Sequence, residues 1–168
     1  MSDGPKIVTA AVLIIGNEIL SGRTKDVNLN HLATELTELG IRMMEARVVA
    51  DIPEDIVAAV NQMRARYDYV FTTGGIGPTH DDITADCIAQ AFGVDISEHP
   101  DAVRMMEARY KPGDFTAARR RMTRVPHGGV LVENPVSTAP GFRVENVYTF
   151  AGIPVVMQAM FKSIRHEL

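Results

Sequence analysis

Apolar residues in the first half of this chain recur with two periods, one typical of buried strands and one typical of helices. Residues 6–15 form a nearly continuous apolar run, which predicts a strand buried on both faces, as in a parallel sheet covered by helices. Residues 29–39 then carry apolar side chains at helical spacing, and Gly40 ends this segment as a glycine after a helix should. The pattern predicts a first strand followed by a first helix.

The same alternation continues to residue 93. Residues 41–49 predict a second strand of more mixed pattern near the edge of the sheet, and Pro53 opens a second helix. A short buried strand at residues 67–73 is followed by a helix from Thr84, whose hydroxyl could cap it, to Gly93. This order predicts a doubly wound α/β fold. If the strand order begins 2-1-3, the loops after strands one and three face one crevice, where such sheets bind ligands.

The second half is less regular, but its segments still complete one domain over residues 1–168. They are predicted as helices at residues 99–110 and 116–122, a strand at 129–132, a hairpin of 142–144 with 147–150, and a closing helix at 155–165.

Composition narrows the class of protein. A chain of 168 residues with 46% hydrophobic content suits one domain with a sizeable core. The net charge of −4 argues against general nucleic-acid binding, and no apolar run approaches a membrane span. The single Cys87 cannot form an internal disulfide, which favours a reducing compartment, and its apolar neighbours predict a buried thiol rather than a nucleophile. We expect a cytoplasmic protein with neither a nucleic-acid nor a membrane partner.

A loop with three glycines, Gly74, Gly75 and Gly77, separates the third strand from its helix. Glycines let the backbone approach a ligand, and N–H groups before a helix suit an anion. Asp81 and Asp82 lie in the same loop and repel phosphate, so they require a cation, a proton or a structural role. The loop matches neither the dinucleotide fingerprint nor the P-loop. The alternative interpretation is a tight strand-to-helix turn in which the Asp and Thr side chains act as caps and no ligand binds.

Two further acids are ambiguous. Glu18, in the loop of residues 16–22, is either a ligand or an ordinary loop carboxylate. Asp51 is either a helix cap or an acid at the carboxyl end of the second strand. The rigid loop at residues 133–141 carries small hydroxyl and amide side chains, which could bind a ring or a ribose of a ligand but are equally typical of a tight turn.

Four arginines form a basic cluster in this acidic chain: Arg119, Arg120, Arg121 and Arg124. On a helix, Arg120 and Arg124 share a face while Arg119 and Arg121 diverge from it. We expect a solvated face or a subunit contact; a phosphate clamp is the alternative. The methionines nearby, Met122 included, are interpreted as core residues.

Three junctions together resemble the molybdopterin-binding domain family of the MoaB/Mog type: residues 72–84, 134–142 and 150–154. Residues 16–22, with Asn28 downstream, resemble one branch of it, the N-terminal domain of the competence/damage-inducible protein A family and the matching domain of FAD synthases. The resemblance covers the chain from Thr9 to the last helix. It implies a three-layer, doubly wound, mostly parallel sheet with a small β-hairpin.

The resemblance implies two activities. One branch is similar to molybdopterin adenylyltransferases of molybdenum cofactor biosynthesis; the other, favoured here, is similar to metal-dependent pyrophosphatases that hydrolyse FAD, ADP-ribose or similar dinucleotides. By position, Asp82 and Asp51 match the catalytic acids, and Asp81 or Asp82 would hold a divalent ion (Mg, Mn or Co), which neutralises the phosphates. The residues expected to bind the nucleotide or pterin are Gly16, Glu18, Asn28, Thr73, Gly74, Gly75, Gly77, Pro78, Thr84, Asn134, Ser137, Pro140, Gly141, Gly152 and Pro154.

One junction departs from the family's pattern. Residues 151–156 read Ala-Gly-Ile-Pro-Val-Val, so the serine and glutamate that follow the second proline in the family are missing. This departure keeps a third function open, a non-catalytic module that binds a nucleotide or pterin. A homo-oligomer is expected.

Overall fold

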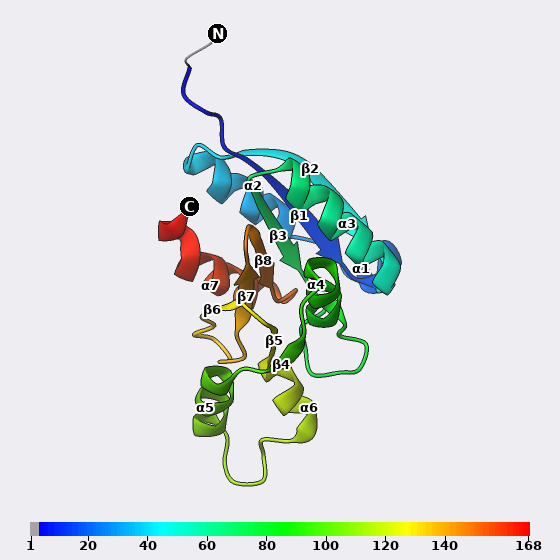
Figure 1. The fold of residues 1–168 in the computed structure, drawn as a ribbon, viewed down its shortest axis with the longest axis vertical. Helices are drawn as coiled ribbons and strands as arrows, with labels where there is room; N and C mark the ends of the chain where they lie inside the picture. The colour runs from blue at the N-terminus through cyan, green and yellow to red at the C-terminus, as the bar shows by residue number, and fades with distance from the viewer. Residues whose placement is uncertain (1–3) are drawn as a thin grey trace.

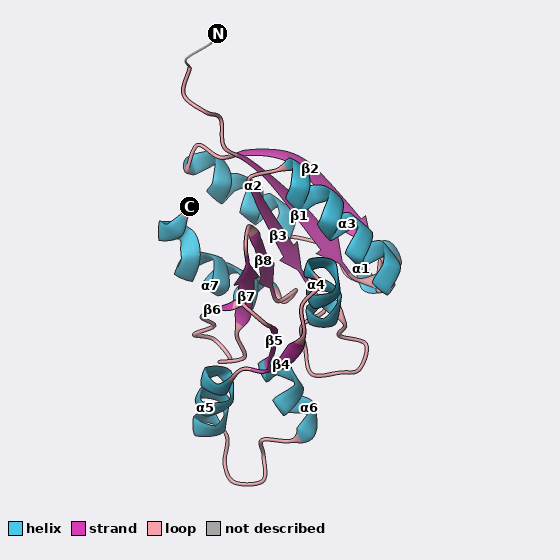
Figure 2. Ribbon diagram, viewed as in Figure 1, coloured by secondary structure: helices cyan, strands magenta, loops and turns pink. Residues whose placement is uncertain are grey.

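The computed structural model describes residues 4–168, which form a six-stranded sheet between two layers of helices (Figures 1 and 2). The strands of this sheet are β1 (Thr9–Ile15), β2 (Arg42–Val49), β3 (Tyr69–Thr73), β6 (Val130–Val132), β7 (Gly141–Val144) and β8 (Val147–Phe150). Their order is β2-β1-β3-β8-β7-β6; the first four strands are parallel, and β7 pairs antiparallel with both β8 and β6. The predicted doubly wound sheet, its 2-1-3 start and the hairpin are confirmed.

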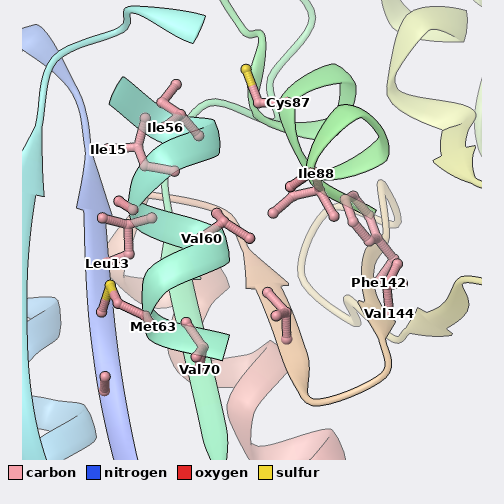
Figure 3. Packing of buried hydrophobic residues seen from close by; sticks show 14 of the residues in the cluster. Leu13, Ile15, Ile56, Val60, Met63, Val70, Cys87, Ile88, Phe142 and Val144 are labelled. Atoms are coloured by element: carbon pink, nitrogen blue, oxygen red, sulfur yellow. The ribbon is translucent and has the colours of Figure 1, made fainter. Parts of the chain in front are cut away.

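The helices that follow these strands are α1 (Asn17–Leu20), α2 (Asn28–Glu38), α3 (Pro53–Arg66), α4 (Thr84–Phe92) and α7 (Pro154–Ile164). Helices α3 and α4 pack on one face of the sheet, and α2 and α7 pack on the other. Figure 3 shows the first layer, where Val60 and Met63 of α3 lie beside Leu13 and Val70 and Ile88 of α4 lies near Phe142. Both faces of β1 are therefore covered, which explains its unbroken apolar run.

A helical insert, residues 96–126, departs from this layered arrangement. It consists of β4 (Ile96–Glu98), α5 (Pro100–Arg109), α6 (Ala117–Arg120), a 3₁₀ turn (Arg121–Thr123) and β5 (Arg124–Pro126). Strands β4 and β5 pair antiparallel as a separate small sheet, and the insert lies at the end of the molecule away from the N-terminus (Figure 1). Neither β4 nor β5 was predicted.

Two local predictions were wrong. Residues 17–22 were predicted as loop, but Asn17–Leu20 form the single turn α1. The helix at Thr84 has Ile83 at its N-cap position, and the Thr84 hydroxyl donates instead to the Gly74 carbonyl at 2.9 Å. The predicted buried thiol is confirmed: burial, with the Asp86 charge second, raises the pKa of Cys87 to about 11. Within residues 4–168, no helix has the length and apolar character needed to cross a membrane.

Candidate functional site

The candidate site lies where the parallel strands end, at the junctions after β1, β3 and β8. The backbones meet there directly: Gly16 N–H donates to Val49 O at 3.1 Å, and Gly74 N–H donates to Phe150 O at 3.1 Å. A Cβ on Gly152 would lie 3.2 Å from the Gly74 Cα, so the loops after β3 and β8 touch through glycines. This places the glycine loop, residues 74–78, between the other two junctions.

The glycine loop is fixed in shape by Thr84, which is fully buried. The Thr84 hydroxyl bonds Gly74 O, and its N–H donates to Gly75 O at 3.0 Å. Gly74 and Gly75 have φ of 97° and 76°, and a Cβ on Gly75 would collide with the Thr84 hydroxyl. Within residues 4–168 the N–H groups of residues 75–77 donate to no protein acceptor. The loop therefore presents free donors, as an anion requires.

The adjacent carboxylates of the loop, Asp81 and Asp82, differ in their surroundings. Asp82 Oδ2 accepts hydrogen bonds from the N–H and the hydroxyl of Thr79, each at 2.9 Å, and lies over Gly77 where a Cβ would be 2.8 Å away. Asp81 is 83% exposed and has only His80 beside it, at 3.5 Å. Asp82 is thus held in a fixed orientation, while Asp81 is free to rotate.

Asp51 lies at the end of β2, facing α1. Its Oδ2 accepts from Asn17 N–H at 3.1 Å, and its own N–H donates to Asn17 Oδ1 at 3.0 Å. Asp51 therefore binds the first N–H group of α1 and lies at the carboxyl end of β2, but it does not cap the helix that opens at Pro53, whose N-cap residue is Ile52 without a side-chain cap hydrogen bond.

An acidic cleft of about 400 Å³ collects these carboxylates. We define this acidic cleft by Glu18, Asp51, Asp81 and Asp82, with Arg23 and His80 as its basic groups. Within residues 4–168 no three His, Cys, Asp or Glu side chains are close enough to form a metal cage. Mg²⁺ needs only one or two carboxylates when a substrate phosphate supplies further oxygens, so the residues present fit an ion bound jointly with a phosphorylated ligand.

An apolar cleft of about 520 Å³ lies on the other side of the glycine loop. We define it by the apolar side chains that line it, Ile76, Met122, Ala139, Ile153, Val156 and Met160. Met122 comes from the helical insert and was interpreted as a core residue, so sequence reasoning missed it. Glu18, Gly75 and Asp82 line both clefts. The two clefts are therefore adjacent.

Asn134 and Ser137 also line the apolar cleft, but the Asn134 amide is engaged within its own loop. Its Nδ2 donates to Ser137 Oγ at 2.7 Å and to Ala139 O at 2.9 Å. Its Oδ1 accepts from the N–H groups of Val136 and Ser137, both at 3.1 Å. Asn134 therefore shapes the wall of the cleft, and Ser137 is the side chain of this loop with a hydroxyl at the cleft surface.

The remaining residues expected to bind the ligand fall into two groups. Those that line a cavity are Asn28, Thr73, Gly74, Gly77, Pro78, Pro140, Gly152 and Pro154. Gly16, Thr84 and Gly141 lie beneath the walls instead: a Cβ on Gly16 would meet the Glu18 carboxylate, and one on Gly141 would meet the Thr149 carbonyl. Gly16 and Gly141 are therefore required as glycines by packing rather than by contact with a ligand.

The structure does not group Arg120 with Arg124, as the helical spacing predicted, but separates Arg119 and Arg120 from Arg121 and Arg124. Arg120 pairs with Glu98 at 2.5 Å, and Arg119 stacks 4.5 Å over the Tyr110 ring, both within the insert. Arg121 and Arg124 turn the other way, toward Asp86 of α4. Because Arg124 lies on β5, it does not share a helical face with Arg120.

The fold and the site define a class of protein, a doubly wound α/β domain with a ligand crevice at the carboxyl ends of its strands. A family model, "Probable molybdopterin binding domain", matches residues 11–168, and the chain belongs to this family.

Relatives and solved structures agree with this assignment. The chain is 37% identical over 163 residues to a protein of Thermoplasma volcanium, a match that covers 95% of this chain and 64% of that protein's length. It is similar to the crystal structure of CinA, titled as of unknown function, from Thermoplasma acidophilum, with a TM-score of 0.90, 34% identity, and coverage of 96% and 98% of the two chains. The tungsten cofactor synthesizing protein MoaB from Pyrococcus furiosus shares the fold, with a TM-score of 0.64 at 21% identity and coverage of 98% and 94%.

Proposed function

We propose that this protein binds a nucleotide pyrophosphate together with a divalent ion and hydrolyses the pyrophosphate. The observation that carries the proposal is that Glu18, Gly75 and Asp82 line both the apolar and the acidic cleft. One ligand can therefore place a planar ring in the first cleft and its phosphates in the second. FAD, ADP-ribose and NAD all have this form.

The apolar cleft supports the ring. Its apolar side chains are aliphatic, proline or methionine, and methionine adapts its shape to a flat aromatic surface. A volume of about 520 Å³ lies in the range of small-molecule sites. Val156, which occupies the position of the family's missing glutamate, lines this cleft and is 6% exposed. The substitution therefore makes the cleft more apolar without filling it.

The acidic cleft supports the chemistry. A divalent ion held by Asp82 and the phosphates would act as a Lewis acid and neutralise the phosphate oxygens. The chain supplies the remaining groups. N–H groups of residues 75–77 donate to phosphate oxygens, and Asp51, oriented by Asn17, accepts a proton from the attacking water. The water oxygen bonds to phosphorus, the bridging P–O bond breaks, and a monophosphate leaves with the bond's electrons.

The test is an assay of the purified protein with FAD, ADP-ribose and NAD in the presence of Mg²⁺, Mn²⁺ or Co²⁺, with AMP measured by chromatography. AMP release that stops on chelation supports the proposal. Binding without AMP release, measured by calorimetry, would instead support the non-catalytic module.

Adenylyl transfer to a molybdopterin is the second candidate, and family membership favours it. The same clefts would serve, but an oxygen of the pterin's phosphate would attack in place of water. The Pyrococcus furiosus MoaB with this fold is titled as a cofactor-synthesizing protein. Incubation with molybdopterin, ATP and Mg²⁺ separates the candidates, because adenylylated pterin forms in the second case alone.

A further inference from the structure

The strand β2 forms one edge of the six-stranded sheet and lies at its outer margin (Figure 1). It has eight residues, whereas β6 at the opposite edge has only three. Natural proteins protect long edges with proline, lysine or a bulge. β2 contains neither proline nor lysine, and its bulge at Met44 leaves residues 45–49 in regular register with β1. The chain therefore has one long edge at which another strand could pair.

The backbone of β2 directs hydrogen-bonding groups toward this outer side. Val49 O accepts a hydrogen bond from Gly16 N–H, so the polar groups of Val49 face the inner side of the strand. The direction of these groups alternates along a strand, so those of Ala46 and Val48 face outward. Ala46 and Val48 are also exposed to solvent. A second strand can therefore reach both the backbone and the side chains of this edge.

The side chains of β2 are complementary to the same strand in antiparallel orientation. With Ala46 opposite Ala46 of a second copy, Glu45 faces Arg47 of that copy. In the same alignment Val48 faces Met44, two apolar side chains that are 40% and 54% exposed. Opposite charges and apolar pairs directly across two strands stabilise a sheet, whereas like charges destabilise it. Centring the pair on Arg47 instead would place two guanidinium groups opposite each other, so the charges select the alignment at Ala46.

We propose that β2 is a dimerisation edge, at which two copies of this chain pair their β2 strands antiparallel across a twofold axis at Ala46. The two six-stranded sheets then form one continuous sheet. A twofold contact uses each β2 edge once and closes on itself, so it yields a dimer rather than a fibre. Single strands form the contact, so the dissociation constant is on the order of micromolar. No ligand takes part, and the dimer is therefore independent of the proposed hydrolysis.

Sedimentation of the full chain over a range of concentrations measures the association, and we expect the wild type to show a monomer–dimer equilibrium. Val48→Lys should raise the dissociation constant about 10-fold or more, because it sets a lysine against Met44 of the second copy. Val130→Lys is the matched control, since Val130 is 51% exposed on the other edge strand, and it should leave the dimer unchanged. A monomeric wild type, an odd-numbered oligomer, or an oligomer unaffected by Val48→Lys would overturn the proposal.

A charge exchange tests the alignment itself. Arg47→Glu and Glu45→Arg each place like charges opposite one another in a homodimer, so each variant alone should be monomeric where the wild type is dimeric. An equimolar mixture restores both pairs of opposite charges and should form a heterodimer. Absence of the heterodimer, with both variants folded by their melting temperatures, would overturn the alignment at Ala46. Glu45 accepts from the Tyr67 hydroxyl at 2.7 Å, so if Glu45→Arg fails to fold, Val48→Lys decides the outcome.

Discussion

The acidic cleft and the apolar cleft share the glycine loop but are built from different parts of the chain. The acidic cleft draws on residues 15–83, the loops of the doubly wound half, and its carboxylates are partly or fully exposed. Most of the apolar cleft's own side chains come from later segments, Met122 of the insert and residues 134–160. Under the proposed function, reaction chemistry and ligand affinity should be separable at side chains that line one cleft alone, such as Asp51 and Met122, but not at Glu18, Gly75 and Asp82, which line both.

The largest expected effect is that of Asp82→Asn in the acidic cleft. Under the proposed function, loss of this metal ligand would remove several kcal/mol of transition-state stabilisation, on the order of a 100-fold or greater fall in kcat. The fold should tolerate the change, because asparagine retains an oxygen that can accept from Thr79. Turnover and the melting temperature of the same preparation are the measurements.

Asp81→Asn is the matched control for this prediction. Asp81 is exposed and makes no bond that orients it toward the glycine loop, so its loss should lower kcat far less. Equal losses in both variants would show that the two acids hold the ion together. Full activity in Asp82→Asn with an intact fold would remove the acidic cleft from the reaction.

The next largest effect concerns the loop between the clefts. Gly75 and Gly22 both have φ of 76°, but a Cβ at Gly22 meets nothing within 4 Å while one at Gly75 collides with Thr84 Oγ1. Gly22→Ala should therefore lower the stability only by the strain of placing a residue with a side chain at positive φ, about 1–2 kcal/mol. Gly75→Ala should cost about 1–3 kcal/mol more, because the brace on Gly74 must shift.

Chemical denaturation of the two alanine variants measures this difference. If Gly75→Ala and Gly22→Ala lose the same stability while nucleotide affinity falls only in Gly75→Ala, the glycine serves ligand approach alone. The structure predicts a loss of both stability and affinity at Gly75, since the same backbone carries the Thr84 brace and the free N–H groups.

The apolar cleft should respond in affinity rather than in rate. Met122→Ala removes apolar contact with a bound ring, and the loss of about 1–2 kcal/mol corresponds to roughly a 10-fold rise in KM with kcat unchanged. Met105, which is 37% exposed in the same insert and lines neither cleft, provides the control. A fall in kcat in Met122→Ala would show that the clefts are coupled.

The same contrast explains what the sequence could predict. The layered half repeats long strands and helices, so the spacing of apolar residues and the glycines after helices located its elements. The winding rule located the crevice between the loops that carry Glu18 and Asp82, but it did not bring Asp51 into that crevice. The position of Met122 in the apolar cleft was not predictable, nor was the separation of Arg121 and Arg124 from Arg119 and Arg120. Both depend on β4 and β5, two strands of three residues that turn the insert back onto α4.

The smallest expected effect is at the contact between the insert and α4. Arg124 pairs with Asp86 through two nitrogens, at 2.6 and 3.3 Å, and is 26% exposed, whereas Arg120 pairs with Glu98 at 44% exposure. Arg124→Ala should therefore cost about 1 kcal/mol of stability, and Arg120→Ala less.

Because Arg121 and Arg124 line a small cavity with Gly75 and Gly77, Arg124→Ala should also loosen the insert's hold on Met122 and raise KM modestly. Thermal unfolding, KM and sedimentation of both variants are the measurements. A changed oligomeric state in Arg120→Ala would place the outer arginines in a subunit contact, and a large fall in kcat in Arg124→Ala would instead bring the insert into the chemistry of the acidic cleft.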